Sequence, residues 1–155
     1  MKKIILSLSF LALAPIAVNA QGGEIEGFIE LLRSDIRTVK VAVLTAAMGL
    51  DEQQAEGFWP LQREYESSLA GINDERIRLI KRYAEQWGTL TDDQAAALAK
   101  GFFSIQERRL KLRKSSYKKM SKEIGALAAA RFIQIENAIQ MLLDLQISAE
   151  LPILE

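Results

Sequence analysis

The chain has 155 residues, with 20 lysines and arginines against 20 acidic residues, no histidine, no cysteine and three prolines. The missing histidine and cysteine exclude Ser-His and Cys-His nucleophilic pairs, the common zinc sites, thiol redox motifs and disulfides. A formal net charge of zero disfavours a general nucleic-acid binder, which carries a basic excess to neutralise phosphates. Length and composition therefore suit one ordinary soluble domain.

Residues 1–20 have the pattern of a cleaved secretory signal peptide. Two lysines are followed by an apolar stretch over 4–18, and compact residues lead to a cleavage position after Ala20. The apolar stretch contains Pro15 and is shorter than the roughly 20 residues of a membrane-spanning helix. We therefore expect export to the periplasm and a mature chain, 21–155, that forms one domain without a membrane span.

Apolar residues of the mature chain recur every three or four positions, as on one face of an α-helix. Four such stripes predict helices over about 24–48, 52–87, 92–123 and 126–148. Gly49 and Gly88 stand where helix C-termini favour a left-handed residue. The predicted core positions are Ile25, Phe28, Ile29, Leu32, Ile36, Val39, Val43, Ala46, Phe58, Leu61, Tyr65, Leu69, Ile72, Leu79, Ile80, Tyr83, Trp87, Leu98, Phe102, Ile105, Leu112, Phe132, Ile135, Ile139, Leu142 and Leu143.

The predicted fold is an all-α, elongated four-helix protein built on a long antiparallel α-hairpin of the second and third helices. At 1.5 Å per residue, a helix of some 35 residues reaches about 50 Å. Such a hairpin exposes more apolar stripe than two shorter helices can cover, so we expect a homodimer or a higher assembly. A seven-residue series flanks the stripe of the third helix: Phe103, Leu110, Tyr117 and Ile124.

Two segments forty residues apart, 50–54 and 90–94, share the pattern of a helix start. In each, the second residue can cap the backbone N–H three residues later, and the final glutamine can reach back to the cap N–H, forming a capping box. The leading leucine takes the N′ position of a hydrophobic staple. This arrangement needs no ligand, so we interpret it as structural. The motif consists of Leu50, Asp51, Gln54, Leu90, Thr91 and Gln94.

The Leu-Thr-x-x-Gln sequence at 90–94, its degenerate copy at 50–54 with Asp51 in place of threonine, and an all-helical mature chain after a signal peptide resemble the LTxxQ-motif periplasmic family, which is Spy/CpxP-like. The resemblance implies a cradle-shaped antiparallel dimer whose concave face holds unfolded clients without ATP during envelope stress. It equally implies an accessory that modulates a sensor kinase. The zinc-responsive relatives bind metal through histidine or cysteine, which this chain lacks.

Residues 108–122 carry eight positive charges and no negative one, whereas 51–75 is rich in acidic residues. In an antiparallel hairpin, position 66 lies opposite about 113, so internal charge pairing is one interpretation. The eight charges span more than one helix face, so the other interpretation is a basic client-binding surface with apolar residues between the charges, such as Leu110 and Met120. The candidate client-binding residues are Arg108, Lys111, Arg113, Lys118, Lys122, Leu112 and Tyr117.

The carboxylate pairs of the sequence, such as Asp92 and Asp93, are adjacent rather than spaced on one helix face. We therefore assign no catalytic residue, no metal site and no cofactor, and we expect a protein that is not an enzyme. The first hypothesis is an ATP-independent chaperone for non-native polypeptides. The second is a regulatory adaptor that docks a specific envelope partner, such as the periplasmic domain of a sensor kinase. A structural envelope protein is the third.

Overall fold

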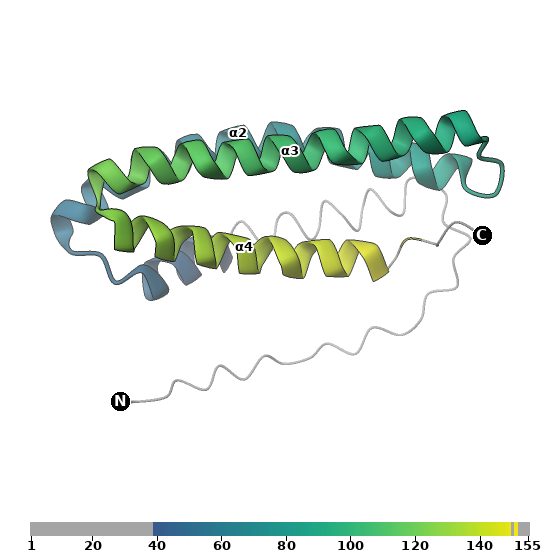
Figure 1. Cartoon of the computed structure of the whole chain (residues 1–155). Helices are drawn as coiled ribbons and strands as arrows, with labels where there is room; N and C mark the ends of the chain where they lie inside the picture. The colour runs from purple at the N-terminus through teal and green to yellow at the C-terminus, as the bar shows by residue number, and fades with distance from the viewer. Residues whose placement is uncertain (1–38, 150, 152–155) are drawn as a thin grey trace.

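The computed structural model describes residues 39–149 and Leu151, and these form an elongated all-α molecule (Figure 1). Residues 39–48 are helical and are followed by α2 (Glu52–Gln86), α3 (Asp92–Glu123) and α4 (Ala126–Ala149). The predicted fold class is confirmed, and the bounds of α2, α3 and α4 agree with the sequence to within one residue. The predicted signal peptide and the predicted helical residues 24–38 lie outside the described residues.

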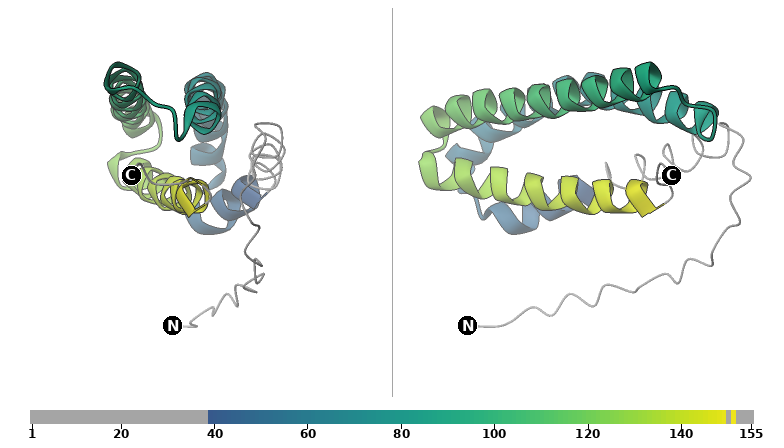
Figure 2. Two further views of the ribbon diagram at one scale, coloured as in Figure 1. Left: turned by 90° about the vertical axis from the view of Figure 1, so that its right-hand side faces the viewer. Right: turned by 45° about the vertical axis from the view of Figure 1, so that its right-hand side comes forward.

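The helices are arranged as a hairpin with one added arm. α2 and α3 run antiparallel, and α4 folds back beneath them (Figure 1). An end-on view places α2 and α3 side by side, with α4 below them and residues 39–48 next to α4 (Figure 2). The backbone of α4 approaches α3, whereas large side chains bridge α4 to α2. We call the end where all four helical segments meet the closed end, and the turn between α2 and α3 the hairpin tip.

Both hairpin helices begin at a complete capping box. The N–H of Gln54 donates to Asp51 Oδ1 over 2.8 Å, and the N–H of Asp51 donates to Gln54 Oε1 over 3.3 Å. At the second helix start, the N–H of Gln94 donates to Thr91 Oγ1 over 3.3 Å, and the N–H of Thr91 donates to Gln94 Oε1 over 2.9 Å. The pairs are those that the sequence predicts, because capping is decided by residues within one helical turn.

Glycine permits both the sharp reversal into α4 and the close approach of α2 to α3. Gly125 has a φ of 87°, where a side chain is unfavourable, and α4 begins at the next residue. The reversal is therefore short and keeps α4 beside α3. Near the hairpin tip, a Cβ atom on Gly101 would lie 2.8 Å from Leu79 Cδ1. A side chain at this position would require the Leu79 side chain to move.

The main core lies at the closed end. The ring of Phe132 on α4 packs edge-on against Phe58, with centroids 5.5 Å apart, and against Tyr65, with centroids 5.3 Å apart. Such pairs contribute about 0.5–1.5 kcal/mol each beyond their burial. Leu44 and Met48 bring residues 39–48 into the same cluster. The buried members are Leu44, Met48, Phe58, Tyr65, Leu69, Met120, Ile124, Ala128, Ala129 and Phe132.

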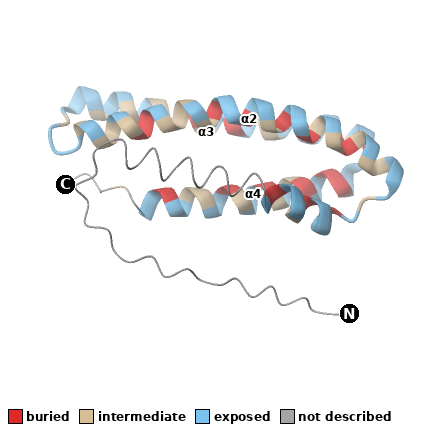
Figure 3. Ribbon diagram, turned by 180° about the vertical axis from the view of Figure 1, so that it is seen from behind, coloured by how far each residue is buried: buried red, intermediate tan, exposed pale blue. Residues whose placement is uncertain are grey.

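Toward the hairpin tip the packing is thinner. Ile72, Leu79 and Ile105 form a small cluster between α2 and α3, and Ile80 packs with Ile147 between α2 and α4. The view from behind shows exposed residues dominating the turn between α2 and α3 (Figure 3). α4 ends before it reaches this turn (Figure 1), so fewer of the described helices cover the tip than the closed end.

Most predicted core residues in the described range are buried or half-buried, but five predictions were wrong. Periodicity finds the apolar face of a helix, yet it does not say whether a neighbouring helix reaches that face. Trp87 is the C-cap residue of α2. Phe102 lies on α3 toward the hairpin tip, beyond the part of α3 that packs against α4. Leu142 lies on the outward side of α4. The five exposed residues are Val39, Ala46, Trp87, Phe102 and Leu142.

Candidate binding surface

A row of exposed apolar side chains follows the outward side of α3. Phe103, Leu110 and Tyr117 are 61%, 47% and 38% exposed. Because seven residues make about two helical turns, these side chains lie on the same side of α3, two turns apart. Ile124, the next member of the series, is buried in the main core. We call Phe103, Leu110 and Tyr117 the α3 row.

Part of the basic run of α3 pairs with α2, as the interpretation of charge pairing predicts. Arg108 pairs with Glu75, and Lys119 pairs with Glu64. The guanidinium of Arg108 hydrogen-bonds the Glu75 carboxylate and holds the pKa of that carboxyl below its usual value. These pairs are exposed to water and contribute little to stability, but they agree with the predicted antiparallel register of the hairpin to within a few residues.

Other lysines of α3 point into solvent beside the α3 row. Lys111, Lys114 and Lys118 are exposed and form no ion pair with another described residue. Lys111 and Lys114 flank Leu110 in the sequence, and Lys118 follows Tyr117. This side of α3 therefore offers large apolar groups and positive charge together.

The seven predicted client-binding residues do not share one surface. Arg113 is half-buried and donates a 2.7 Å hydrogen bond to Asn137 Oδ1 of α4. Leu112 packs against the main core, and Met120, named beside them in the sequence, is fully buried there. Neighbouring positions on a helix point in different directions, so a run in the sequence is divided among several faces. The predicted members that remain exposed and face solvent without an ion pair are Lys111, Lys118, Lys122 and Tyr117.

A second exposed apolar surface covers the outward side of α4. Four large apolar residues there are between 58% and 77% exposed: Leu127, Met141, Leu142 and Leu145. The three charged residues of α4 are all engaged within the molecule. Arg131 donates to the carbonyl of Met48, Glu136 is buried, and Asp144 pairs with Arg109. The sequence prediction missed this surface, although the near absence of charge from α4 is its signal.

The outward sides of α3 and α4 border each other. Arg113 contacts Asn137, and Arg109 contacts Asp144, so the two helices lie side by side and antiparallel. Figure 2 shows α4 running below α3, with α2 beside α3. The candidate binding surface therefore has two parts, the α3 row with its lysines and the uncharged outward side of α4.

A buried ionic cluster ties residues 39–48 to α2 and α4. Lys40 Nζ lies 2.5 Å from Glu136 Oε2 and also pairs with Glu66. The hydroxyl of Tyr65 donates to Glu136 Oε1 over 3.1 Å, and Gln140 Nε2 lies 3.5 Å from the same oxygen. Burial, together with the Glu136 carboxylate, raises the pKa of Tyr65 well above its usual value. Tyr65 therefore keeps its proton and serves as a donor, and the cluster holds the scaffold together.

A second polar cluster joins α2, α3 and α4 further along. Arg109 is almost fully buried, and its Nη2 donates to Asn73 Oδ1 over 2.9 Å. Its Nη1 lies 3.3 Å from both carboxylate oxygens of Asp144. Arg76 Nη1 lies 2.7 Å from Asp144 Oδ1, and burial lowers the pKa of Arg76 while the carboxylate of Asp144 opposes that shift. Arg109 thus belongs to the scaffold and not to the solvent-facing charges of α3.

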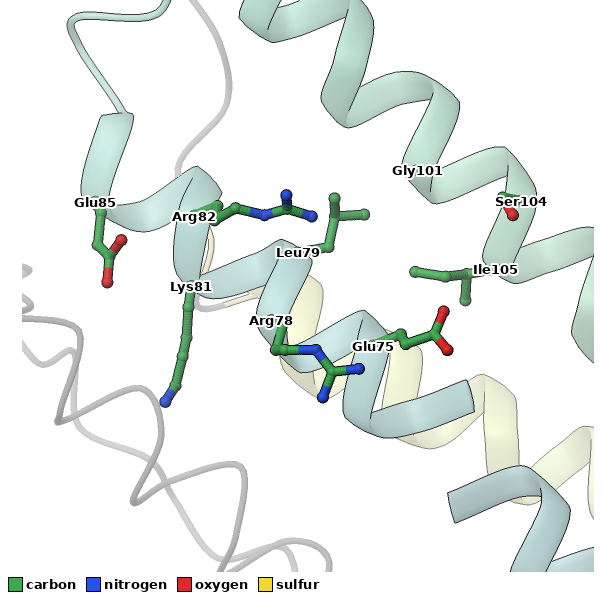
Figure 4. A pocket seen from close by; sticks show the side chains of 9 residues that line it. All are labelled: Glu75, Arg78, Leu79, Lys81, Arg82, Glu85, Gly101, Ser104 and Ile105. Carbon is green, nitrogen blue, oxygen red and sulfur yellow. The ribbon is translucent and has the colours of Figure 1, made fainter. Parts of the chain in front are cut away.

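Two open cavities flank α2. One, of about 490 Å³, lies between α2 and α3, where Leu79 and Ile105 point toward each other and Lys81 points away (Figure 4). The other, of about 520 Å³, adjoins the buried ionic cluster beside Lys40. The first is lined by Glu75, Arg78, Leu79, Lys81, Arg82, Glu85, Gly101, Ser104 and Ile105. The second is lined by Lys40, Val41, Gln62, Arg63, Glu66, Ser67, Leu69, Ala70, Asn73, Asp74, Gln140 and Leu143. Both linings mix apolar contact with charges of both signs.

A scan against protein-family models, a search of curated proteins and a search of solved structures each gave no match. Within residues 39–149, no helix is long and apolar enough to cross a membrane. The same part of the chain brings together no group of three or more side chains of the kinds that hold a metal ion.

Proposed function

We propose that the protein is a periplasmic, non-enzymatic chaperone that binds non-native polypeptides without ATP and works as a homodimer. The resemblance to the LTxxQ-motif family implies this function. The observation that supports it most is the α3 row, in which three large apolar side chains stand exposed beside solvent-facing lysines. A row of exposed apolar side chains beside positive charge offers both apolar contact and electrostatic attraction to another polypeptide.

The two properties of the α3 row suit two stages of binding. Lys111, Lys114 and Lys118 raise the local concentration of acidic clients and speed their encounter with α3. The apolar row then contacts the apolar segments that a non-native chain exposes. Because this contact is non-directional, it does not require one client sequence. A client that folds buries the same segments in its own core, so its affinity for the α3 row falls and it is released.

An aggregation-suppression assay with two unrelated denatured clients tests this function. We expect the wild-type protein to protect both clients. Lys111→Glu, Lys114→Glu and Lys118→Glu combined should slow client association at low salt by at least about tenfold, since steering of this kind changes association rates by 10–10³. The matched control reverses three exposed arginines of α2, Arg63, Arg78 and Arg82, with the same change in net charge.

Equal loss in the α3 and α2 variants would contradict the proposed role of the α3 lysines. Failure of the wild-type protein to protect either client would contradict the chaperone function itself. If that failure came with capture of a single envelope protein, such as the periplasmic domain of a sensor kinase, the regulatory adaptor would replace the chaperone as the proposed function.

A further inference from the structure

The outward side of α4 lacks the features that a solvated helix face normally has. Leu127 and Leu145 stand near its two ends, and each is more than two-thirds exposed. Along the 18 residues from one to the other, about 27 Å of helix, the sole charged residue that faces outward is Arg131. The Nη1 atom of Arg131 donates to the Met48 carbonyl, at the end of the helical residues 39–48. Its charge is therefore directed toward the scaffold.

The pattern of large and small residues on this side is compatible with a two-fold axis. Leu127 and Leu145 lie equally far from position 136, on either side of it. When two copies of α4 are placed antiparallel about this position, Ala130 faces the partner's Leu142, and Gln134 faces the partner's Ala138. A large residue thus meets a small one at these two levels, Arg131 lies opposite the partner's Met141, and leucine meets leucine at the two ends. An isologous contact requires this kind of self-complementarity.

The distribution of charge favours a second copy of the chain, and not a client, as the partner of the outward side of α4. Two α3 rows placed against each other would bring together the solvent-facing Lys111, Lys114 and Lys118 of both copies, and like charges repel. Two outward sides of α4 bring together no lysines, and each Arg131 lies opposite the partner's Met141 and donates to the Met48 carbonyl of its own chain. An acidic client, in turn, gains nothing electrostatically on α4 but is attracted to α3.

We propose that the protein self-associates through the outward side of α4, which pairs antiparallel with α4 of a second copy about a two-fold axis near position 136. This interface is distinct from the α3 row, so the pairing leaves both rows open to solvent. A dimer then presents two client-binding rows on one body, and a long non-native chain that reaches both gains avidity over one that reaches a single row. This consequence for clients rests on the proposed chaperone function, whereas the pairing itself does not.

Sedimentation equilibrium at tens of micromolar tests which surface pairs. We expect the wild-type protein to be a dimer, and Leu142→Glu with Leu145→Glu to produce a monomer of unchanged helical content. The matched control, Leu110→Glu with Tyr117→Glu, changes two exposed apolar residues on α3 and should remain a dimer. A wild-type monomer, or a dimer that the α3 change dissociates and the α4 change does not, would overturn the proposal.

Disulfide cross-linking tests the antiparallel register, and the absence of natural cysteine makes the readout clean. In the proposed dimer, position 127 of one copy lies about 27 Å along the axis from position 127 of its partner but opposite the partner's position 145. Leu127→Cys protein alone and Leu145→Cys protein alone should therefore cross-link poorly, whereas a mixture allowed to exchange subunits should cross-link efficiently. Efficient cross-linking of either variant alone, or none in the mixture, would overturn the register.

Discussion

The closed end and the hairpin tip use the same two helices but differ in what supports them. At the closed end, α2 and α3 are joined by α4 and residues 39–48 around three aromatic rings and a buried ionic cluster. At the tip, the two helices share a few aliphatic contacts, and Trp87 and Phe102 remain exposed. The comparison teaches that stability is concentrated at one end. Among residues 39–149, the other end extends the hairpin and carries exposed apolar side chains such as Phe102.

The largest expected effect is the loss of stability when a core residue is truncated, and this loss should differ between the two ends. Phe132→Ala should lower the free energy of unfolding by about 4 kcal/mol, because it removes both ring contacts and leaves a cavity enclosed by four helical segments. Ile105→Ala at the thinner end should cost about 2 kcal/mol, since solvent or its neighbours can fill the space more easily. Denaturant unfolding followed by circular dichroism measures both. Equal costs would contradict the comparison.

The buried ionic cluster gives the second effect. Glu136→Leu should cost about 3 kcal/mol, because it removes one of the two carboxylates around the buried ammonium of Lys40. Adding Lys40→Met should recover much of that loss, since no unpaired charge then remains in the core. The matched control is the exposed pair of Lys119 and Glu64, where the corresponding double change should cost about 0.5 kcal/mol or less.

If Lys40→Met instead deepens the loss in Glu136→Leu, the charge of Lys40 stabilises the fold even when Glu136 is absent. A thermodynamic cycle of the two single variants and the double variant gives the coupling between Lys40 and Glu136 directly. A coupling near zero would mean that the two residues do not interact in solution.

A third prediction concerns alkaline pH and Tyr65. The pKa of Tyr65 is raised in the folded chain, whereas an unfolded tyrosine titrates near pH 10. The unfolded chain therefore binds fewer protons than the folded chain above about pH 10, so stability is present below that pH and falls as the pH rises. Tyr65→Phe should cost about 1 kcal/mol at neutral pH through the lost hydrogen bond and should make the decline above pH 10 shallower.

Thermal or denaturant unfolding between pH 7 and about 11 tests this slope. The control is Tyr117→Phe, which removes an exposed hydroxyl of the α3 row and should leave the stability at neutral pH unchanged. A wild-type slope above pH 10 that Tyr65→Phe does not alter would show that groups other than Tyr65 cause the alkaline loss.

Local patterns predicted the fold well because they are decided within a few residues. The capping boxes at 50–54 and 90–94 and the spacing of apolar residues determine where α2, α3 and α4 begin and end. The sequence does not predict the buried cluster, although two of its three ions, Lys40 and Glu136, stand on apolar stripes. Glu136 follows Phe132 by four positions, and Lys40 precedes Leu44 by four. A charge at such a position signals a buried partner, but the sequence does not name that partner.

The binding surface was predicted only in part because exposure depends on where helices end relative to one another. The α3 row was visible as a seven-residue series, but its exposure was not. Leu112 and Arg113 were grouped with Lys111 by their place in a basic run, although they point toward the core and α4. Leu142 was assigned to the core because periodicity does not reveal that no described helix covers the outward side of α4.

The smallest expected effect is the loss of a helix cap. It compares the two ends directly, because the same capping motif starts a helix at each end. Asp51 caps α2 at the closed end, and Thr91 caps α3 at the hairpin tip. Replacing either by alanine should cost about 1 kcal/mol of global stability. The two losses should nevertheless differ in native-state amide exchange. If the tip opens while the closed end stays folded, Thr91→Ala should speed the exchange of tip amides about fivefold, since 1 kcal/mol corresponds to such a factor.

Asp51→Ala should leave those tip amides unchanged and speed only the slowest amides of the closed end, because its cap is intact in the partly open state and lost only on global unfolding. Client protection should persist in both variants, since neither cap belongs to the α3 row. If both substitutions sped the tip and the closed end equally, the two ends would unfold as one unit. The extra helices of the closed end would then stabilise the hairpin along its whole length, and the exposed apolar residues at the tip would stand on a rigid support.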